Sequence, residues 1–183
     1  MFENKLVFTI FNKIFSEQVM KLRNKIFLLV VGILLIIQLP VFRPAKNFTD
    51  AEPVNDIAKA YDVPMDIQMH IYDGCYSCHS NYTEKYFWYY NIQPVSWWMA
   101  SHIRNAKREL NFSEFATYSP QRALKKFEEI EKVMVRKSMP LKSYTLTHKE
   151  ARFTDEDFHD VAEWARGMQK ELSQKKETPS APE

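Results

Sequence analysis

The 183-residue chain is poor in glycine and cysteine, with three of the first and two of the second. It contains no glycine-rich phosphate loop, which excludes the nucleotide-binding proteins that depend on one. No segment alternates apolar and polar residues over the length of a strand, so no β-sheet competes with a helical fold. No internal repeat occurs either. These absences indicate a small helical protein that uses cysteine at very few positions.

A basic domain surface is also lacking. Residues 43–183 hold 20 basic and 21 acidic side chains, although the whole sequence has a formal net charge of +2. The excess of positive charge therefore lies in residues 1–42. A nucleic-acid partner would require a basic face on the folded domain, and none is evident, so we expect no nucleic-acid partner.

Both cysteines lie within "DGCYSCHSNY", residues 73–82, where Cys75 and Cys78 are followed directly by His79. Three kinds of site use such a pair. A redox dithiol usually lies beside a βαβ pattern, and a zinc site needs a fourth ligand and normally a second paired half. Covalent haem attachment uses C-x-x-C-H, in which two thiols bond to the haem vinyl groups and the adjacent imidazole binds the iron.

The surroundings of the motif favour haem attachment. No parallel-sheet pattern and no second cysteine pair accompany it. The two-residue gap allows both sulfurs to reach one edge of the porphyrin while His79 lies over its face. We therefore predict one covalent haem c, with thioether bonds to Cys75 and Cys78 and with His79 as the proximal iron ligand.

Thioether attachment normally takes place outside the cytoplasmic membrane, and the N-terminal sequence fits an exported protein. Residues 26–42 carry no charge, and a helix of that length spans about 25 Å, near the lower limit for a bilayer core. Residues 1–25 hold five basic against two acidic side chains, which places them in the cytoplasm. We expect a retained transmembrane anchor in the bacterial inner membrane with the rest of the chain in the periplasm. A cleaved signal peptide, and a true start at Met20, stay open.

Beyond the anchor the chain is long enough for one domain. Residues 43–60 have the composition of a short spacer, and residues 174–183 that of a disordered tail. The haem domain is predicted between them, over residues 61–173. Together these segments predict an all-α protein: a single N-terminal transmembrane helix followed by a small, cytochrome-c-like helical domain.

Several helices are expected in this domain. Apolar residues at three- and four-residue spacing predict amphipathic helices, and Ser or Thr followed by Pro or acidic residues marks two of their starts. The predicted segments are 54–61, 64–72, 94–110, a helix from Ser119–Pro120 that ends before Pro140, and a helix that begins at Thr154.

The stretch "CYSCHSNYTEKYFWYYNIQPVSWWMASHIRNAKRELNFSEF" resembles the bacterial haem-binding domain family of small, membrane-anchored, c-type cytochrome-like proteins. The shared elements are CxxCHSN at 75–81, an aromatic run at 88–97 and L-N-F-S-E at 110–114, with Phe115 where the family usually has Trp. The resemblance covers roughly residues 61–172. It implies covalent haem c and a domain that faces the periplasm.

The sixth iron ligand is predicted to be Met139. It stands 60 residues after His79, directly before Pro140 and beyond the basic end of an amphipathic helix, where the chain leaves regular structure. A thioether is soft and neutral, and it favours ferrous iron. His148, in a later loop, and His102, on the helix after the aromatic run, are alternative ligands, and an open, five-coordinate iron is a third possibility.

The aromatic run after the motif is expected to wall the haem, with Trp88 and Trp97 as candidate pocket residues. The leading interpretation is a membrane-anchored monohaem cytochrome that transfers electrons to a redox partner protein or respiratory complex. A five-coordinate haem sensor or peroxidase-like enzyme is one alternative. A haem-stapled subunit of a membrane complex is the other.

Overall fold

A computed structural model describes residues 2–84 and 86–177, and all regular structure within these ranges is helical. The chain divides into two units. The first unit comprises the chain up to Pro44 together with Trp88–Trp97. The second unit comprises Ala45–Phe87 and the chain from Trp98 onward. The expectation of an all-α protein is confirmed for the described residues.

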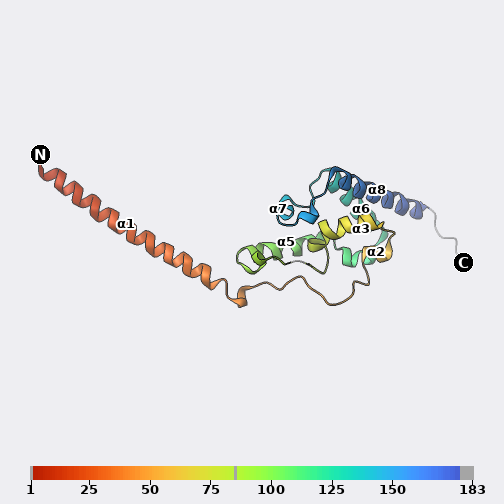
Figure 1. Cartoon of the computed structure of the whole chain (residues 1–183), viewed down its shortest axis with the longest axis horizontal. Helices are drawn as coiled ribbons and strands as arrows, with labels where there is room; N and C mark the ends of the chain where they lie inside the picture. Colours follow the sequence, from red (N-terminus) through yellow and green to blue (C-terminus); the bar gives the residue numbers. More distant parts are fainter. Residues whose placement is uncertain (1, 85, 178–183) are drawn as a thin grey trace. The chain divides into compact units, whose positions relative to one another are not determined.

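The first unit begins with the long helix α1, Phe2–Ile36 (Figure 1). The single helix expected over 26–42 is not formed, because α1 ends at Ile36 and the one-turn helix η1, Pro40–Phe42, follows a bend. Pro40 has no amide hydrogen and disfavours a helical residue before it, and Leu39 is accordingly extended. Within residues 2–84 and 86–177, no helix combines the length and the apolar character that crossing a membrane requires.

Polar contacts organise the rest of the first unit. The Gln38 and Gln93 residues exchange two hydrogen bonds: the Gln38 amide nitrogen donates to the Gln93 carbonyl at 3.1 Å, and the Gln93 backbone N–H donates to Gln38 Oε1 at 2.9 Å. The Trp97 indole N–H donates to the Phe42 carbonyl at 2.6 Å. These bonds connect the bend after α1 to the segment that contains η3, Trp88–Asn91.

The second unit is built on two helices that pack along each other, α6 (Pro120–Val135) and α8 (Asp155–Glu177), with α3 (Met65–Ile71) against α8 (Figure 1). Their apolar stripes face inward, as the sequence spacing predicts. The stripe residues of α6 and α8 that are buried are Ala123, Phe127, Ile130, Met134, Val161, Ala162 and Ala165.

The predicted helix starts are also confirmed. The Ser119 hydroxyl accepts a hydrogen bond from the Arg122 N–H at 3.3 Å, with Pro120 as the first helical residue. At α8, Thr154 Oγ1 accepts from the Asp157 N–H at 3.2 Å, and Asp157 accepts from the Thr154 N–H at 2.7 Å. The helix α8 runs four residues into the segment 174–183 that was expected as a tail, and 178–183 lie outside the described residues.

The segment 43–60 is more than the predicted spacer. It contains the short helix α2, Ile57–Ala60, and both Asp56 and Ile57 are buried. The Asn47 carbonyl accepts from the Thr83 N–H, and the Asn47 amide donates to the Ser80 carbonyl, each at 2.9 Å. Ordered packing of the second unit therefore begins before residue 61, because the backbone and the side chain of Asn47 satisfy backbone groups of the loop after the motif.

Candidate functional site

The Cys75–Cys78–His79 motif lies on a helix with an irregular centre. The helix α3 continues through a π-helical segment η2, Tyr72–Tyr76, into the short helix α4, Ser77–His79. A π-helical turn inside a helix is rare and is often found at functional sites. It re-spaces the side chains around Cys75, so the cysteines do not occupy the positions that an ideal α-helix would give them.

The two cysteines are free thiols and are half-buried. Burial raises the pKa of Cys75 to about 12 and that of Cys78 to about 11. Both side chains are therefore protonated at neutral pH. A redox dithiol needs at least one thiol with a lowered pKa, so these cysteines lack the electrostatic environment of a disulfide oxidoreductase.

His79 is oriented by a backbone carbonyl at the end of helix α5, Val95–Glu109. Its Nδ1 lies 3.1 Å from the carbonyl oxygen of Leu110, which has no intrahelical partner at this position. A carbonyl only accepts hydrogen bonds, so Nδ1 carries the proton and Nε2 holds the lone pair. Burial lowers the pKa of His79, which favours the neutral ring. This is the arrangement that a metal-binding histidine requires.

A polar network that we did not predict holds the loop after His79. The Asn81 N–H donates to Ser113 Oγ at 3.1 Å, and its side-chain amide donates to Glu114 at 2.7 Å. The Asn111 amide donates to Asn81 Oδ1 at 2.9 Å. These partners lie at the start of η4, Phe112–Thr117, and they belong to the L-N-F-S-E element. The signal in the sequence was this element itself, whose polar residues are the partners of Asn81.

The loop that contains Met139 packs beside the motif. A Cβ at Gly74 would lie 3.0 Å from Pro140 Cγ and 2.6 Å from Phe153 Cζ. Pro140 is buried, and Met139 is half-buried against the apolar core. The structure therefore brings the Met139–Pro140 segment next to the residue that precedes Cys75, and any side chain larger than glycine at that position would force Phe153 or Pro140 to shift.

His148 also lies in the second unit and is almost completely buried, with 2% of its surface exposed. Its ring stacks on Tyr144 at 3.8 Å, and its Nδ1 lies 3.2 Å from the Tyr144 carbonyl. Tyr144 in turn interacts with Ser77, between the two cysteines, and burial raises its pKa to about 12. Tyr144 is thus a neighbour of the motif that the sequence gave no reason to select.

The two tryptophans predicted to wall the haem belong to the first unit. Trp88 is 72% exposed, and the Trp97 indole N–H is bonded to the Phe42 carbonyl. The second unit, which contains the cysteines and His79, does not include either of them. Their role as haem-pocket residues stays a prediction.

The donor set fits a haem better than a bare metal ion. Among residues 2–84 and 86–177, no group of three or more His, Cys, Asp or Glu side chains is assembled that could hold a metal ion. A zinc site would need such a group. A haem brings its own equatorial nitrogens, so it needs only axial ligands and a point of attachment. One oriented imidazole and two free thiols on the same helical stretch meet that requirement.

Comparisons with known proteins also indicate that the bound group is a haem. The family described as "Haem-binding domain" matches residues 32–167, which is about three quarters of the 183 residues. No curated protein and no solved structure matches the chain. The match includes the motif, the Leu110 carbonyl that orients His79 and the Met139–Pro140 loop. The chain therefore belongs to the haem-binding domain family.

Proposed function

We propose that this haem-binding protein is a monohaem c-type cytochrome that transfers electrons, with the haem bound covalently. The observation that carries the proposal is the contact between His79 Nδ1 and the Leu110 carbonyl. His79 lies on the same helical stretch as both cysteines. This contact leaves Nε2 as the coordinating atom and holds the ring in one orientation. A ligand that is already oriented reorganises little between the two oxidation states.

Cys75 and Cys78 would attach the cofactor. Each thiol adds as S–H across one vinyl group: the S–C bond forms at one vinyl carbon, and the hydrogen goes to the other. The raised pKa of both thiols keeps them protonated, which suits this addition and suppresses oxidation to a disulfide.

Met139 would supply a second protein ligand to the iron. Its loop packs against Gly74 through Pro140, which fixes the loop relative to Cys75. When bound, the haem supplies a one-electron change between ferric and ferrous iron. The protein supplies the ligands and a mostly apolar surrounding, and a thioether ligand raises the reduction potential.

We also propose a location for the protein. The uncharged run 26–42 follows a segment rich in positive charge, and covalent attachment normally requires export. We therefore place the chain at the bacterial inner membrane with the haem facing the periplasm. There it would exchange electrons with a redox partner protein or a respiratory complex.

Covalent attachment is tested on the purified protein by haem staining after denaturing electrophoresis. We expect the stain to remain with the wild-type polypeptide, and to be lost when both Cys75 and Cys78 are changed to Ala. Complete extraction of the haem from the wild type by acid and organic solvent would contradict the proposal, since thioether bonds survive that treatment.

The sixth ligand separates an electron carrier from a five-coordinate sensor or peroxidase. We expect the ferrous wild type not to bind carbon monoxide, and Met139→Ala to bind it rapidly. Met134→Ala is the matched control, because Met134 is a buried core residue of α6. An unchanged spectrum and potential in Met139→Ala would move the assignment to His148.

A further inference from the structure

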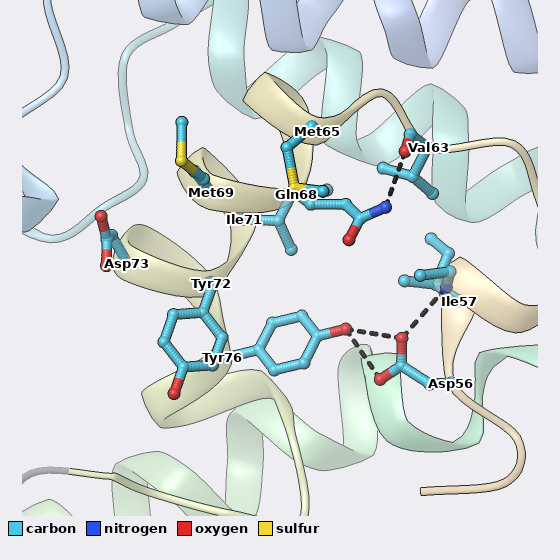
Figure 2. A pocket seen from close by; sticks show the side chains of 11 residues that line it. Asp56, Ile57, Val63, Met65, Gln68, Met69, Ile71, Tyr72, Asp73 and Tyr76 are labelled. Atoms are coloured by element: carbon cyan, nitrogen blue, oxygen red, sulfur yellow. Dashed lines mark hydrogen bonds between the residues drawn. The ribbon is translucent and has the colours of Figure 1, made fainter.

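A cavity of roughly 440 Å³ opens in the second unit between α2 and the helix that carries the motif. Figure 2 shows Tyr76 reaching across it toward Asp56, and the Gln68 side chain, from the same helical stretch, pointing toward Val63. Apolar walls come from Ile57, Val63 and Ile71. The lining residues do not include Cys75, Cys78 or His79, so the cavity is distinct from the attachment site.

The side-chain donors at the cavity are already used by the protein. The Tyr76 hydroxyl lies 2.7 and 2.8 Å from the two Asp56 oxygens, and Gln68 Nε2 donates to the Val63 carbonyl at 2.8 Å. The Tyr72 hydroxyl donates to Glu84 at 2.9 Å. These side chains therefore offer hydrogen-bond acceptors to an incoming group. The acceptors are the side-chain oxygen of Gln68 and the carboxylate of Asp56, and Asp56 is only 7% exposed.

The rim of the cavity is apolar and exposed. Met65, Met69 and Tyr72 keep 72%, 57% and 46% of their surface accessible. Large side chains with this much exposure, grouped around a cavity, are typical of an interaction surface. Methionine suits such a surface because its flexible thioether adapts to different partners.

The surrounding chain is strongly acidic. Residues 47–84 contain seven acidic side chains and one lysine, Lys59, which gives this segment a net charge of −6. The ammonium of Lys59 is 2.7 Å from Glu52 and so does not neutralise the cavity. Asp66 is exposed on α3 beside Met65, and Asp73 lines the cavity. The surface is complementary to a cation.

The position of this surface connects it to the haem. Tyr72, Asp73 and Tyr76 all line the cavity, and they lie in the same π-helical segment as Cys75. A partner bound here would be within one helical turn of the point of attachment. Electron transfer between proteins requires this kind of proximity, and the interfaces of redox partners are small and have complementary charges.

We propose that this surface, made of Asp56, Met65, Asp66, Met69, Tyr72 and Asp73, docks a redox partner protein that presents a Lys or Arg side chain within an apolar patch. The basic side chain enters the cavity toward Asp56 and Gln68, and its apolar neighbours contact the two methionines. This inference rests on the proposed electron transfer, and it adds the site and the chemistry of the partner.

The test measures the rate of electron exchange of the full-length holoprotein by stopped-flow spectroscopy. The probes are a basic cytochrome c, an acidic cytochrome of similar size, and a small uncharged quinol. We expect the rate with the basic cytochrome to fall at least tenfold between about 0.01 M and about 1 M salt. The rate with the quinol should not change.

Two charge-reversed variants sharpen the test. Asp66→Lys should slow exchange with the basic cytochrome about five-fold at low salt. Glu128→Lys, the same change on an exposed residue of α6, should leave the rate within about two-fold. If Asp66→Lys disturbs the fold, as judged by circular dichroism, Asp66→Asn replaces it and should act in the same direction. Replacing Met65 and Met69 by Ser should slow exchange even at high salt, where charge attraction is screened.

Equal rates for Asp66→Lys and Glu128→Lys would overturn the docking site, as would equal rates with the acidic and the basic cytochrome. In both cases exchange with the quinol would continue, and the proposed electron transfer would stand. No exchange with any probe, the quinol included, would overturn the electron transfer itself and the docking site with it.

Discussion

Two parts of the second unit are stabilised in different ways. The α6–α8 pair is joined by periodic apolar stripes, and its side chains come from regular helices. The motif helix, in contrast, is irregular and is held by polar contacts to distant loops, such as His79 to Leu110 and Asn81 to Ser113. The α6–α8 pair therefore supplies most of the apolar burial of the unit, whereas the contacts of the motif helix set the geometry of the site.

The largest effect is expected in the α6–α8 pair. Phe127 is fully buried, and its ring lies 5.1 to 5.5 Å from the rings of Phe115, Tyr61 and Trp164. Phe127→Ala should lower the free energy of unfolding by about 3–5 kcal/mol, because it leaves a cavity among three aromatic rings. Urea denaturation followed by circular dichroism measures the change.

The control for this variant is Val135→Ala, at a 63% exposed position of the same helix. It should change the free energy of unfolding by no more than about 0.5 kcal/mol. Similar losses in the two variants would show that α6 is not stabilised by burial of its stripe.

The next effect is expected at Gly74, where the motif helix meets the Met139–Pro140 loop. Gly74→Ala places a methyl group 2.6 Å from Phe153 Cζ and 3.0 Å from Pro140 Cγ. It should destabilise the protein by about 1–3 kcal/mol and reduce the yield of haem-loaded protein. Gly167→Ala, on α8, meets nothing within 4 Å and should be neutral or stabilising, by up to about 1 kcal/mol.

The cause of the Gly74 effect can be isolated. Adding Phe153→Leu to Gly74→Ala removes the aromatic ring edge and should restore part of the lost stability. If Gly74→Ala and Gly167→Ala have the same stability and the same haem yield, the packing of the loop on the motif helix is refuted.

A smaller effect is expected from the polar network. Asn81→Ala leaves the buried Asn111 amide without its acceptor and removes a donor to Glu114. The loss should be about 1–2 kcal/mol. It should also shift the absorption spectrum of the haem, since this network anchors the residues directly after His79. Asn105→Ala, which removes an exposed contact to Arg108, is the control and should leave the spectrum unchanged.

The difference between the periodic helices and the contacts of the loops explains which features could be predicted from the sequence. The apolar stripe that contains Phe127 and the helix start at Ser119–Pro120 follow from local sequence patterns, and both were predicted. The contacts of Asn47 and Asn81, and the orientation of His79, join residues 30 or more positions apart. Such pairs depend on the path of loops and have no periodic signal, so their partners could not be identified. The expected helix over 26–42 failed for a local reason, because Pro40 interrupts it.

The smallest effect concerns the pH dependence of the α6–α8 pair. Glu131 on α6 accepts hydrogen bonds from Gln169 and Arg166 of α8, each at 2.7 Å. The hydrogen bond from Gln169, followed by that from Arg166, lowers the pKa of Glu131. A lowered carboxyl pKa stabilises the folded protein above the unfolded-state pKa of about 4.3, and this contribution is lost as the pH falls through the folded-state pKa.

Because both charged groups are partly solvated, the contribution should stay below about 1 kcal/mol. Glu131→Gln keeps the shape of the side chain and removes its charge. The wild type should therefore be more stable than this variant at pH 7, and the difference should vanish as the pH falls below the folded-state pKa. Urea midpoints of both proteins across this range measure it. A difference that stays constant with pH would mean that packing, and not the charge of Glu131, joins the two helices at this point.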